Sequence, residues 1–155
     1  MVLSSVGALL LLLGNTAPCP VDMVCLAPGE EKVVSAFARL HWNHTRIAVD
    51  ADETYDIAVR PGSLWKDASH EVPAKGYELR RLALFRPFRR QREASWFELI
   101  GAVGESERSA FRIGEHLAEP VTFHASGELV LYANDARFMY WNNCGSIDVI
   151  VRRLR

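Results

Sequence analysis

Short segments in which apolar and polar residues alternate are the first regularity in this chain. Residues 46–50 read Arg-Ile-Ala-Val-Asp, and residues 55–60 read Tyr-Asp-Ile-Ala-Val-Arg. A period of two with β-branched and aromatic residues is typical of strands that bury one face. The polar run Asp50–Glu53 between them predicts a turn. The sequence therefore predicts a β-hairpin over 46–60.

Further apolar segments follow at intervals of about 10 to 15 residues, with Gly and Pro between them. None shows the 3.6-residue period of an amphipathic helix. This spacing predicts an all-β fold, either an antiparallel sandwich or a barrel. The additional predicted strands cover 96–103, 111–114, 120–123, 128–133 and 147–151.

The alternation weakens between Lys66 and Arg92, where Val72–Gly76 predicts a loop. Six arginines then fall within 80–92, interleaved with leucine and phenylalanine. One interpretation is a surface for an anionic partner such as nucleic acid or an acidic glycan. We favour a long solvated loop with a few apolar residues packed beneath it, because the pattern matches no nucleic-acid-binding module.

The size and composition fit one ordinary globular domain. The chain has 155 residues, of which 49% are hydrophobic and 24% charged, so it can bury a core. Its formal net charge of −1 gives no general attraction to nucleic acid or anionic membranes. Three cysteines are too few for a disulfide framework. Cys19 and Cys25 are close enough to pair if the protein is exported, which leaves Cys144 single.

The N-terminal part has a different character. Val6–Gly14 is an apolar run too short to span a bilayer, and it fits the central region of a secretory signal. No Lys or Arg precedes it, so a buried strand or helix is the alternative. The prolines of 18–32 predict an irregular connector. We therefore divide the chain into 1–32, a possible signal and connector, and a domain over 33–155, with secretion and a cytoplasmic location both open.

Oxygen-bearing side chains gather in the segment between the last two predicted strands. Asp135 is followed seven residues later by Asn142 and Asn143. Carboxylate and amide oxygens are what Ca²⁺ takes as ligands, and the backbone carbonyl of Met139 could add another. Gly145 would let the chain turn back sharply into the last strand. The alternative is that these Asn and Asp residues only form the loop.

The same segment resembles the calcium loop of the PA-IL-like bacterial galactose-binding lectins. The shared pattern is Tyr132-Ala-Asn-Asp135, six residues, then Asn142-Asn143-Cys-Gly-Ser146, with Cys144 where the family has serine. Trp42-x-x-Thr-x-Ile-x-Val49 is similar to the family's first strands, and Phe97–Gly114 to its middle strands. The resemblance covers roughly 33–153 and is specific in the loop.

The resemblance implies a small, antiparallel, jelly-roll-like β-sandwich (galactose-binding-domain-like) in which one Ca²⁺ bridges protein and sugar. It implies that Asp135, Asn142 and Asn143 ligate the ion and also contact the sugar. It further implies backbone carbonyl ligands at Met139 and near Val49.

This chain differs from the family in the segment that binds the outer hydroxyls of the sugar. The family uses a histidine and a glutamine in a His-Pro-x-Gln-Gly segment, and the matching positions here are Val72 and Lys75. His70 lies two residues away and could replace the histidine. Our predicted sugar-binding set therefore adds His70, Lys75 and Tyr140, whose ring offers a flat face for a pyranose. The sugar stays open between galactose and another hexose.

No motif of a catalytic site is present, so we expect a binding protein and not an enzyme. His41 and His44 have the spacing of a zinc-binding pair but lack the glutamate and the helix of that motif. Two functions follow: a calcium-dependent carbohydrate-binding module, or a structural or protein-interaction module on the same fold. We expect carbohydrate as partner, no nucleic acid, no membrane span and a possible homo-oligomer, which would raise avidity.

Overall fold

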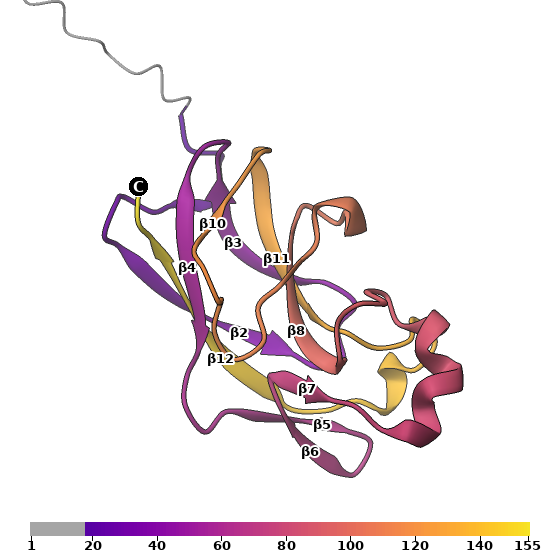
Figure 1. Cartoon of the computed structure of the whole chain (residues 1–155). Helices are drawn as coiled ribbons and strands as arrows, with labels where there is room; N and C mark the ends of the chain where they lie inside the picture. Colours follow the sequence, from indigo (N-terminus) through magenta and orange to yellow (C-terminus); the bar gives the residue numbers. More distant parts are fainter. Residues whose placement is uncertain (1–17) are drawn as a thin grey trace, which may run out of the picture.

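Two β-sheets packed face to face form the body of the protein (Figure 1). The computed structural model describes residues 18–155, so the predicted signal segment lies outside the described residues. The first sheet has the order β1 (Val24–Cys25), β3 (Asn43–Val49), β11 (Gly127–Ala133), β8 (Trp96–Val103) and β7 (Lys75–Tyr77), with β9 (Phe111–Arg112) also paired to β8. The second has the order β10 (Val121–Thr122), β4 (Thr54–Val59), β12 (Ser146–Arg153) and β2 (Glu31–Phe37).

Smaller elements complete the fold. The strands β5 (Leu64–Asp67) and β6 (His70–Pro73) pair as a hairpin. Three 3₁₀ segments, η1 (Arg80–Phe88), η2 (Glu107–Ser109) and η3 (Tyr140–Asn142), are the helical elements of the described chain. Every strand pair is antiparallel except β1 with β3. The predicted all-β sandwich is confirmed.

Alternate residues of the central strands meet between the sheets and form the core. Ile47 of β3, Ile57 of β4, Leu131 of β11 and Val149 of β12 have no accessible surface. Burying a side chain of this size stabilises the fold by roughly 1.5–3 kcal/mol. The alternation seen in the sequence therefore identifies the buried face of each strand.

The predicted hairpin over 46–60 is wrong, although both of its strands exist. β3 pairs with β1 and β11, whereas β4 pairs with β10 and β12 in the other sheet. The turn between them, with Asp52 at φ 70°, carries the chain across the sandwich. Periodicity shows which face of a strand is buried, but it does not show which strand lies beside it.

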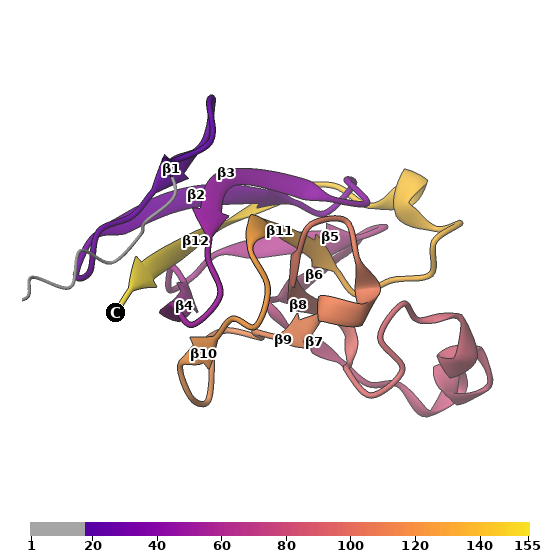
Figure 2. The same cartoon turned by 90° about the horizontal axis from the view of Figure 1, so that it is seen from above.

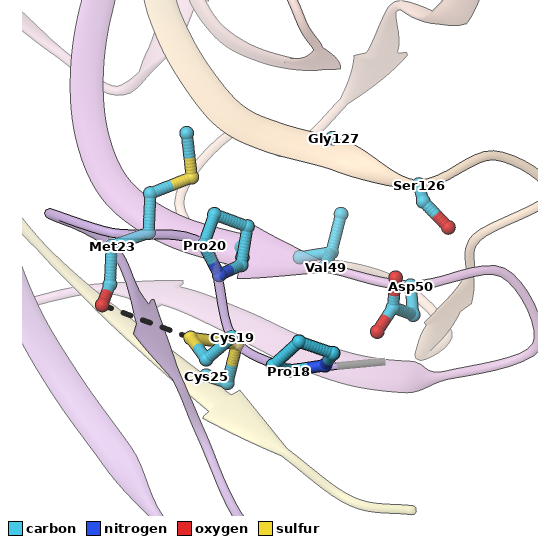
Figure 3. A pocket seen from close by; sticks show the side chains of 10 residues that line it. Pro18, Cys19, Pro20, Met23, Cys25, Val49, Asp50, Ser126 and Gly127 are labelled. Atoms are coloured by element: carbon cyan, nitrogen blue, oxygen red, sulfur yellow. Dashed lines mark hydrogen bonds between the residues drawn. A yellow bond between two sulfur atoms is a disulfide. The ribbon is translucent and has the colours of Figure 1, made fainter. Parts of the chain in front are cut away.

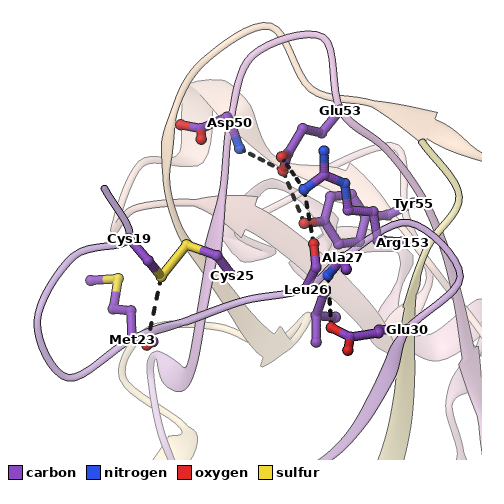
Figure 4. Close-up of a disulfide and its surroundings, with 10 residues drawn as sticks. All are labelled: Cys19, Met23, Cys25, Leu26, Ala27, Glu30, Asp50, Glu53, Tyr55 and Arg153. Atoms are coloured by element: carbon purple, nitrogen blue, oxygen red, sulfur yellow. Dashed lines mark hydrogen bonds and ion pairs between the residues drawn. A yellow bond between two sulfur atoms is a disulfide. The ribbon is translucent and has the colours of Figure 1, made fainter. Parts of the chain in front are cut away.

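The segment 18–32 packs on the sandwich, and the boundary that we placed at residue 33 falls inside β2. A disulfide joins Cys19 and Cys25, as Figure 4 shows. The short strand β1 lies along β3, and Leu26 is 4% exposed within the core. The Arg153 guanidinium donates to the Leu26 carbonyl at 2.8 Å and pairs with Glu53 at 2.6 Å. Among residues 18–155 no helix has the length and apolar character needed to cross a membrane.

The predicted loop Val72–Gly76 is instead the junction of β6 and β7. Val72 is buried, and Gly76 has a φ of +70° with its α-carbon against β8. A β-carbon at Gly76 would lie 2.2 Å from the Trp96 carbonyl oxygen, so this glycine marks a close approach of two strands.

The arginine-rich stretch also differs from the prediction. We expected apolar residues beneath a solvated loop, but η1 has no buried residue. The two residues that follow it, Arg89 and Arg90, are buried. The sequence pattern misleads here because the chain buries arginine side chains that have aromatic and carboxylate partners, and leaves its leucine and phenylalanine outside.

Candidate functional site

The loop between β11 and β12 is held at both of its ends. At the first end, the Asn134 side chain is wholly buried and accepts the Gln91 N–H at 2.8 Å. It donates to the carbonyls of Gln91 and Ser95 at 2.8 and 2.9 Å. At the other end, Gly145 has a φ of 81° and its carbonyl accepts the Ala38 N–H. The predicted sharp turn at Gly145 is confirmed.

Asp135 and Asn143 meet inside this loop. Asp135 is 5% exposed and Asn143 is 2% exposed. Asn143 Nδ2 donates to Asp135 Oδ2 at 2.9 Å, and the Ala136 N–H donates to Asp135 Oδ1 at 2.7 Å. Burial raises the pKa of the Asp135 carboxyl above its usual range, although these two hydrogen bonds act in the opposite direction. The structure therefore brings together two of the three predicted side-chain ligands.

Two amide oxygens of the loop have no hydrogen-bond partner. Both Asn142 Oδ1 and Asn143 Oδ1 are buried and accept nothing from the described chain. A buried acceptor without a partner costs about 1–3 kcal/mol. Two such oxygens in the loop that also carries the buried Asp135 carboxylate offer the ligand types that suit a hard cation. Among residues 18–155 no three His, Cys, Asp or Glu side chains are arranged so that they could hold a metal ion, so the argument for a cation rests on the amide and backbone carbonyl oxygens.

A second carboxylate, Asp67, was missed in the sequence. Asp67 ends β5, and a β-bridge between Lys66 and Cys144 brings β5 to the loop. The Tyr77 hydroxyl donates to Asp67 Oδ2, and the negative charge of Asp67 also raises the pKa of Asp135. No local motif could have identified Asp67, because only the fold brings it close to Asp135.

Both carboxylates open into one groove, which we call the aromatic groove. Its volume is about 370 Å³, and most of its wall is apolar. Cavities of this size, apolar with a few polar groups, are typical of small-molecule sites. It is lined by Asp67, Tyr77, Leu82, Phe85, Phe88, Trp96, Asp135, Ala136, Phe138 and Met139.

Met139 and His70 lie close to this arrangement. Met139 lines the aromatic groove, and its carbonyl accepts the Asn142 N–H at 3.2 Å. His70 is exposed and lines a neighbouring cavity of about 430 Å³, which shares Asp67 and Tyr77 with the groove. Met139 and His70 thus lie near the Asp135 and Asp67 carboxylates. The assignment of the Met139 carbonyl as a calcium ligand stays a prediction.

The structure does not bring Val49 to the loop. Val49 pairs with Gly127 at one end of β3, whereas Asn43 pairs with Leu131 at the end near the loop. Six strand positions separate these ends by roughly 20 Å. Figure 3 shows Val49 instead beside Cys19 and Cys25, where it lines a different cavity of about 260 Å³.

Lys75 and Tyr140 do not reach the aromatic groove either. Lys75 pairs with Glu98 across β7 and β8, and it lines a separate cavity with Arg112. Tyr140 is 2% exposed, and its hydroxyl donates to the Ala133 carbonyl. Burial raises the pKa of Tyr140. Its ring supports the loop from inside and offers no face to a ligand.

Arg90 fixes the other side of the loop. Its side chain is fully buried, and Nε donates to Glu107 at 2.7 Å. One terminal nitrogen donates to the Tyr140 hydroxyl at 2.9 Å. The guanidinium carbon lies 4.2 Å from the ring centre of Trp42 and 3.5 Å from that of Tyr132. Arg90 thus joins the segment after η1 to β11 and to η3.

Comparisons with known proteins support the fold. No family model matches the chain, and a search of curated proteins finds no match. Among solved structures, the chain is similar to the EclA N-terminal domain, described as a PllA-like lectin. The two share 21% sequence identity with a TM-score of 0.58, over 78% of this chain and 94% of that one. At this identity the similarity shows a common β-sandwich fold.

Proposed function

We propose that this protein is a calcium-dependent carbohydrate-binding module of the PA-IL-like type. The observation that carries the proposal is the buried oxygen Asn143 Oδ1, which has no partner in the described chain although the amide of Asn143 contacts Asp135. Asn142 Oδ1, in the same loop, is also buried without a partner. The match in loop spacing to that lectin family supports it, and so does the similarity to a structure described as a lectin.

The residues present fit a calcium ion. Asp135 and Asp67 would supply charge, and Asn142, Asn143 and the Met139 carbonyl would supply neutral oxygens. Two carboxylates would balance the charge of the ion, in place of the single carboxylate that we expected. Asn143 now presents its amide nitrogen to Asp135, so a half-turn of this amide would direct its oxygen there instead.

When bound, calcium supplies open coordination positions for vicinal hydroxyls, because it takes six to eight oxygens. Asp135 and the two asparagines would also accept hydrogen bonds from these hydroxyls. His70 beside Asp67 would contact an outer hydroxyl of a galactose or another hexose. These groups bind and orient a ligand, so the proposed activity is recognition and not catalysis.

We further propose an extracytoplasmic location. The Cys19–Cys25 disulfide forms and persists in oxidising compartments. The apolar run at 6–14 agrees with export.

Calcium titration calorimetry on the calcium-free protein tests the proposal. We expect one calcium ion per chain and no heat of binding for Asp135→Ala. The matched control is Asp148→Ala, which removes a carboxylate of β12 that pairs with Arg60. This variant should bind calcium like wild type. Equal calcium affinity in Asp135→Ala and wild type would refute the site.

A glycan array probed with calcium and then with EDTA tests the second half of the proposal. We expect bound hexose glycans only with calcium. Calcium binding without any calcium-dependent glycan would instead favour a structural or protein-interaction module on the same fold.

A further inference from the structure

The outer side of η1 is unusually apolar for a surface element. Leu84 is 86% exposed, Phe85 52% and Phe88 53%, and no residue of η1 is buried. A 3₁₀ helix of nine residues is long for its type and gains little from its own hydrogen bonds. An element of this kind, with its apolar side chains outside, is expected to have a partner.

These side chains form one continuous patch. The ring centres of Phe85 and Phe88 are 6.4 Å apart, and those of Phe88 and Phe138 are 5.8 Å apart. Phe138 is 63% exposed and comes from the loop between β11 and β12. Contiguous exposed apolar surface marks interaction sites, whereas single exposed apolar residues do not.

Exposed arginines flank the patch along the chain. Arg80, Arg81, Arg86 and Arg92 are exposed, and within residues 18–155 only Arg86 has an acidic partner, Glu93 at 3.5 Å. The whole chain has a formal net charge of −1, so this positive charge is concentrated in one stretch of the sequence. We call the four apolar residues and these four arginines the η1 surface.

We propose that the η1 surface docks on an anionic phospholipid bilayer. Leucine and phenylalanine enter the boundary between headgroups and acyl chains, while guanidinium groups bind lipid phosphates at the same depth. Single-stranded nucleic acid fits less well, because Leu84 cannot stack on a base and the phenylalanine rings pack on one another.

Docking of this kind would give the protein a defined orientation. η1 projects from the sandwich, and the N-terminal segment with the Cys19–Cys25 disulfide lies at the opposite end of the molecule (Figure 2). Phe85, Phe88 and Phe138 also line the aromatic groove, so the groove would lie at the membrane plane. The inference does not depend on calcium or sugar binding.

Vesicle co-sedimentation in EDTA tests the proposal without any contribution from calcium. The probes are vesicles of phosphatidylcholine alone and vesicles with 30 mol% phosphatidylglycerol. We expect at least about tenfold stronger partitioning to the anionic vesicles, since each arginine near such a surface contributes roughly fivefold. We expect most of this gain to disappear in 0.5 M salt. Equal partitioning to both vesicles would overturn the proposal.

The combined variant Leu84→Ser/Phe85→Ser/Phe88→Ser should lose at least about tenfold in partitioning to anionic vesicles. Because these side chains are exposed, its melting temperature should stay close to that of wild type. Phe37→Ser is the matched control, since Phe37 is 50% exposed on β2, and it should partition like wild type. Wild-type partitioning of the combined variant would overturn the proposal.

Two further outcomes would assign the surface to another partner and overturn the lipid proposal. One is self-association in analytical ultracentrifugation that the combined variant abolishes, which would indicate a second copy of the chain. The other is binding of a single-stranded oligonucleotide that displaces the protein from anionic vesicles.

Discussion

Asn134 shows how one buried polar residue can position a whole loop. Its side chain bonds to the backbone of 91–95 on one side, and its backbone N–H bonds to the Glu98 carbonyl on the other. Asp135 follows directly, so the anchor also fixes where this carboxylate lies. The Asn-Asp pair in the sequence thus has two separate roles, one structural and one proposed for binding.

Asn134→Ala should therefore lower the free energy of unfolding by about 2 kcal/mol or more, because several buried backbone groups lose their partner. Urea denaturation in EDTA measures this change. Asn142→Ala is the comparison: it removes a buried amide oxygen that has no partner, so no loss of unfolding free energy is expected. Equal effects of the two substitutions would contradict the anchor role.

His44 should make stability depend on pH. Its hydrogen bond to Glu128 at 2.8 Å, helped by Glu105, raises the pKa of His44 above 6.5. Burial of Glu128 opposes ionisation, but His44 and the Arg46 N–H outweigh it and lower the pKa of Glu128. The charged His44–Glu128 pair thus stabilises the fold below pH 6.5. This stabilisation is lost as the pH rises through the folded pKa of His44. It is also lost in acid, where Glu128 becomes protonated.

The stability difference between wild type and His44→Gln should accordingly be larger near pH 6 than near pH 9. Thermal or urea unfolding across this range provides the measurement. His124→Gln, which removes an exposed histidine outside the ion pairs of residues 18–155, is the control. A difference that does not change with pH would refute the assignment.

At the scale of elements, Arg90 ties the segment after η1 to the sandwich. Arg90→Ala would leave a buried space between Trp42 and Tyr132 and remove a donor from Glu107 and Tyr140. We expect a loss of about 3 kcal/mol in unfolding free energy. Arg86→Ala, which removes an exposed arginine, should change it by less than about 0.5 kcal/mol. An equally small effect of Arg90→Ala would show that the contacts of Arg90 do not hold this segment on the sandwich.

The sequence predicted most strands but not their neighbours. Strand periodicity depends only on which face is buried, and it located β3, β4, β8, β11 and β12. Pairing depends on where turns send the chain, so β3 and β4 were wrongly joined. The burial of Arg90 could not be foreseen, because its partners Trp42, Tyr132 and Tyr140 come from distant segments.

The candidate site was predictable where its residues are close in sequence. Asp135, Asn142 and Asn143 belong to one loop, and their spacing in the sequence was enough to predict them as calcium ligands. Asp67 comes from the β5–β6 hairpin, and only the folded structure shows that it lies in the same groove as Asp135. We expected a backbone carbonyl near Val49 to reach the loop, but Val49 lies at the far end of β3. The sequence identified the strand, but it did not show which end of the strand lies near the loop.

At the scale of the whole molecule, the two ends of the sandwich carry different features. One end carries the 135–143 loop, the aromatic groove and η1, and the other carries the disulfide-closed N-terminal loop (Figures 2 and 4). The end with the disulfide ties the segment 18–32 to the sandwich, and the other end carries the proposed binding site.

Removal of the disulfide should therefore cost stability without changing the site. Cys19→Ser/Cys25→Ser should lower the unfolding free energy by up to about 2 kcal/mol, since the closed loop is short. Calcium affinity by calorimetry should equal that of wild type. A parallel loss of calcium affinity would show that the two ends are coupled.

A crystal grown with calcium, examined by an anomalous difference map, tests the central claim most directly. The account predicts one strong peak within about 2.3–2.6 Å of oxygen atoms of Asp135, Asn142 and Asn143. A map without a peak at these three side chains, or with calcium held only by other acidic residues such as Glu105 and Glu128, would contradict it.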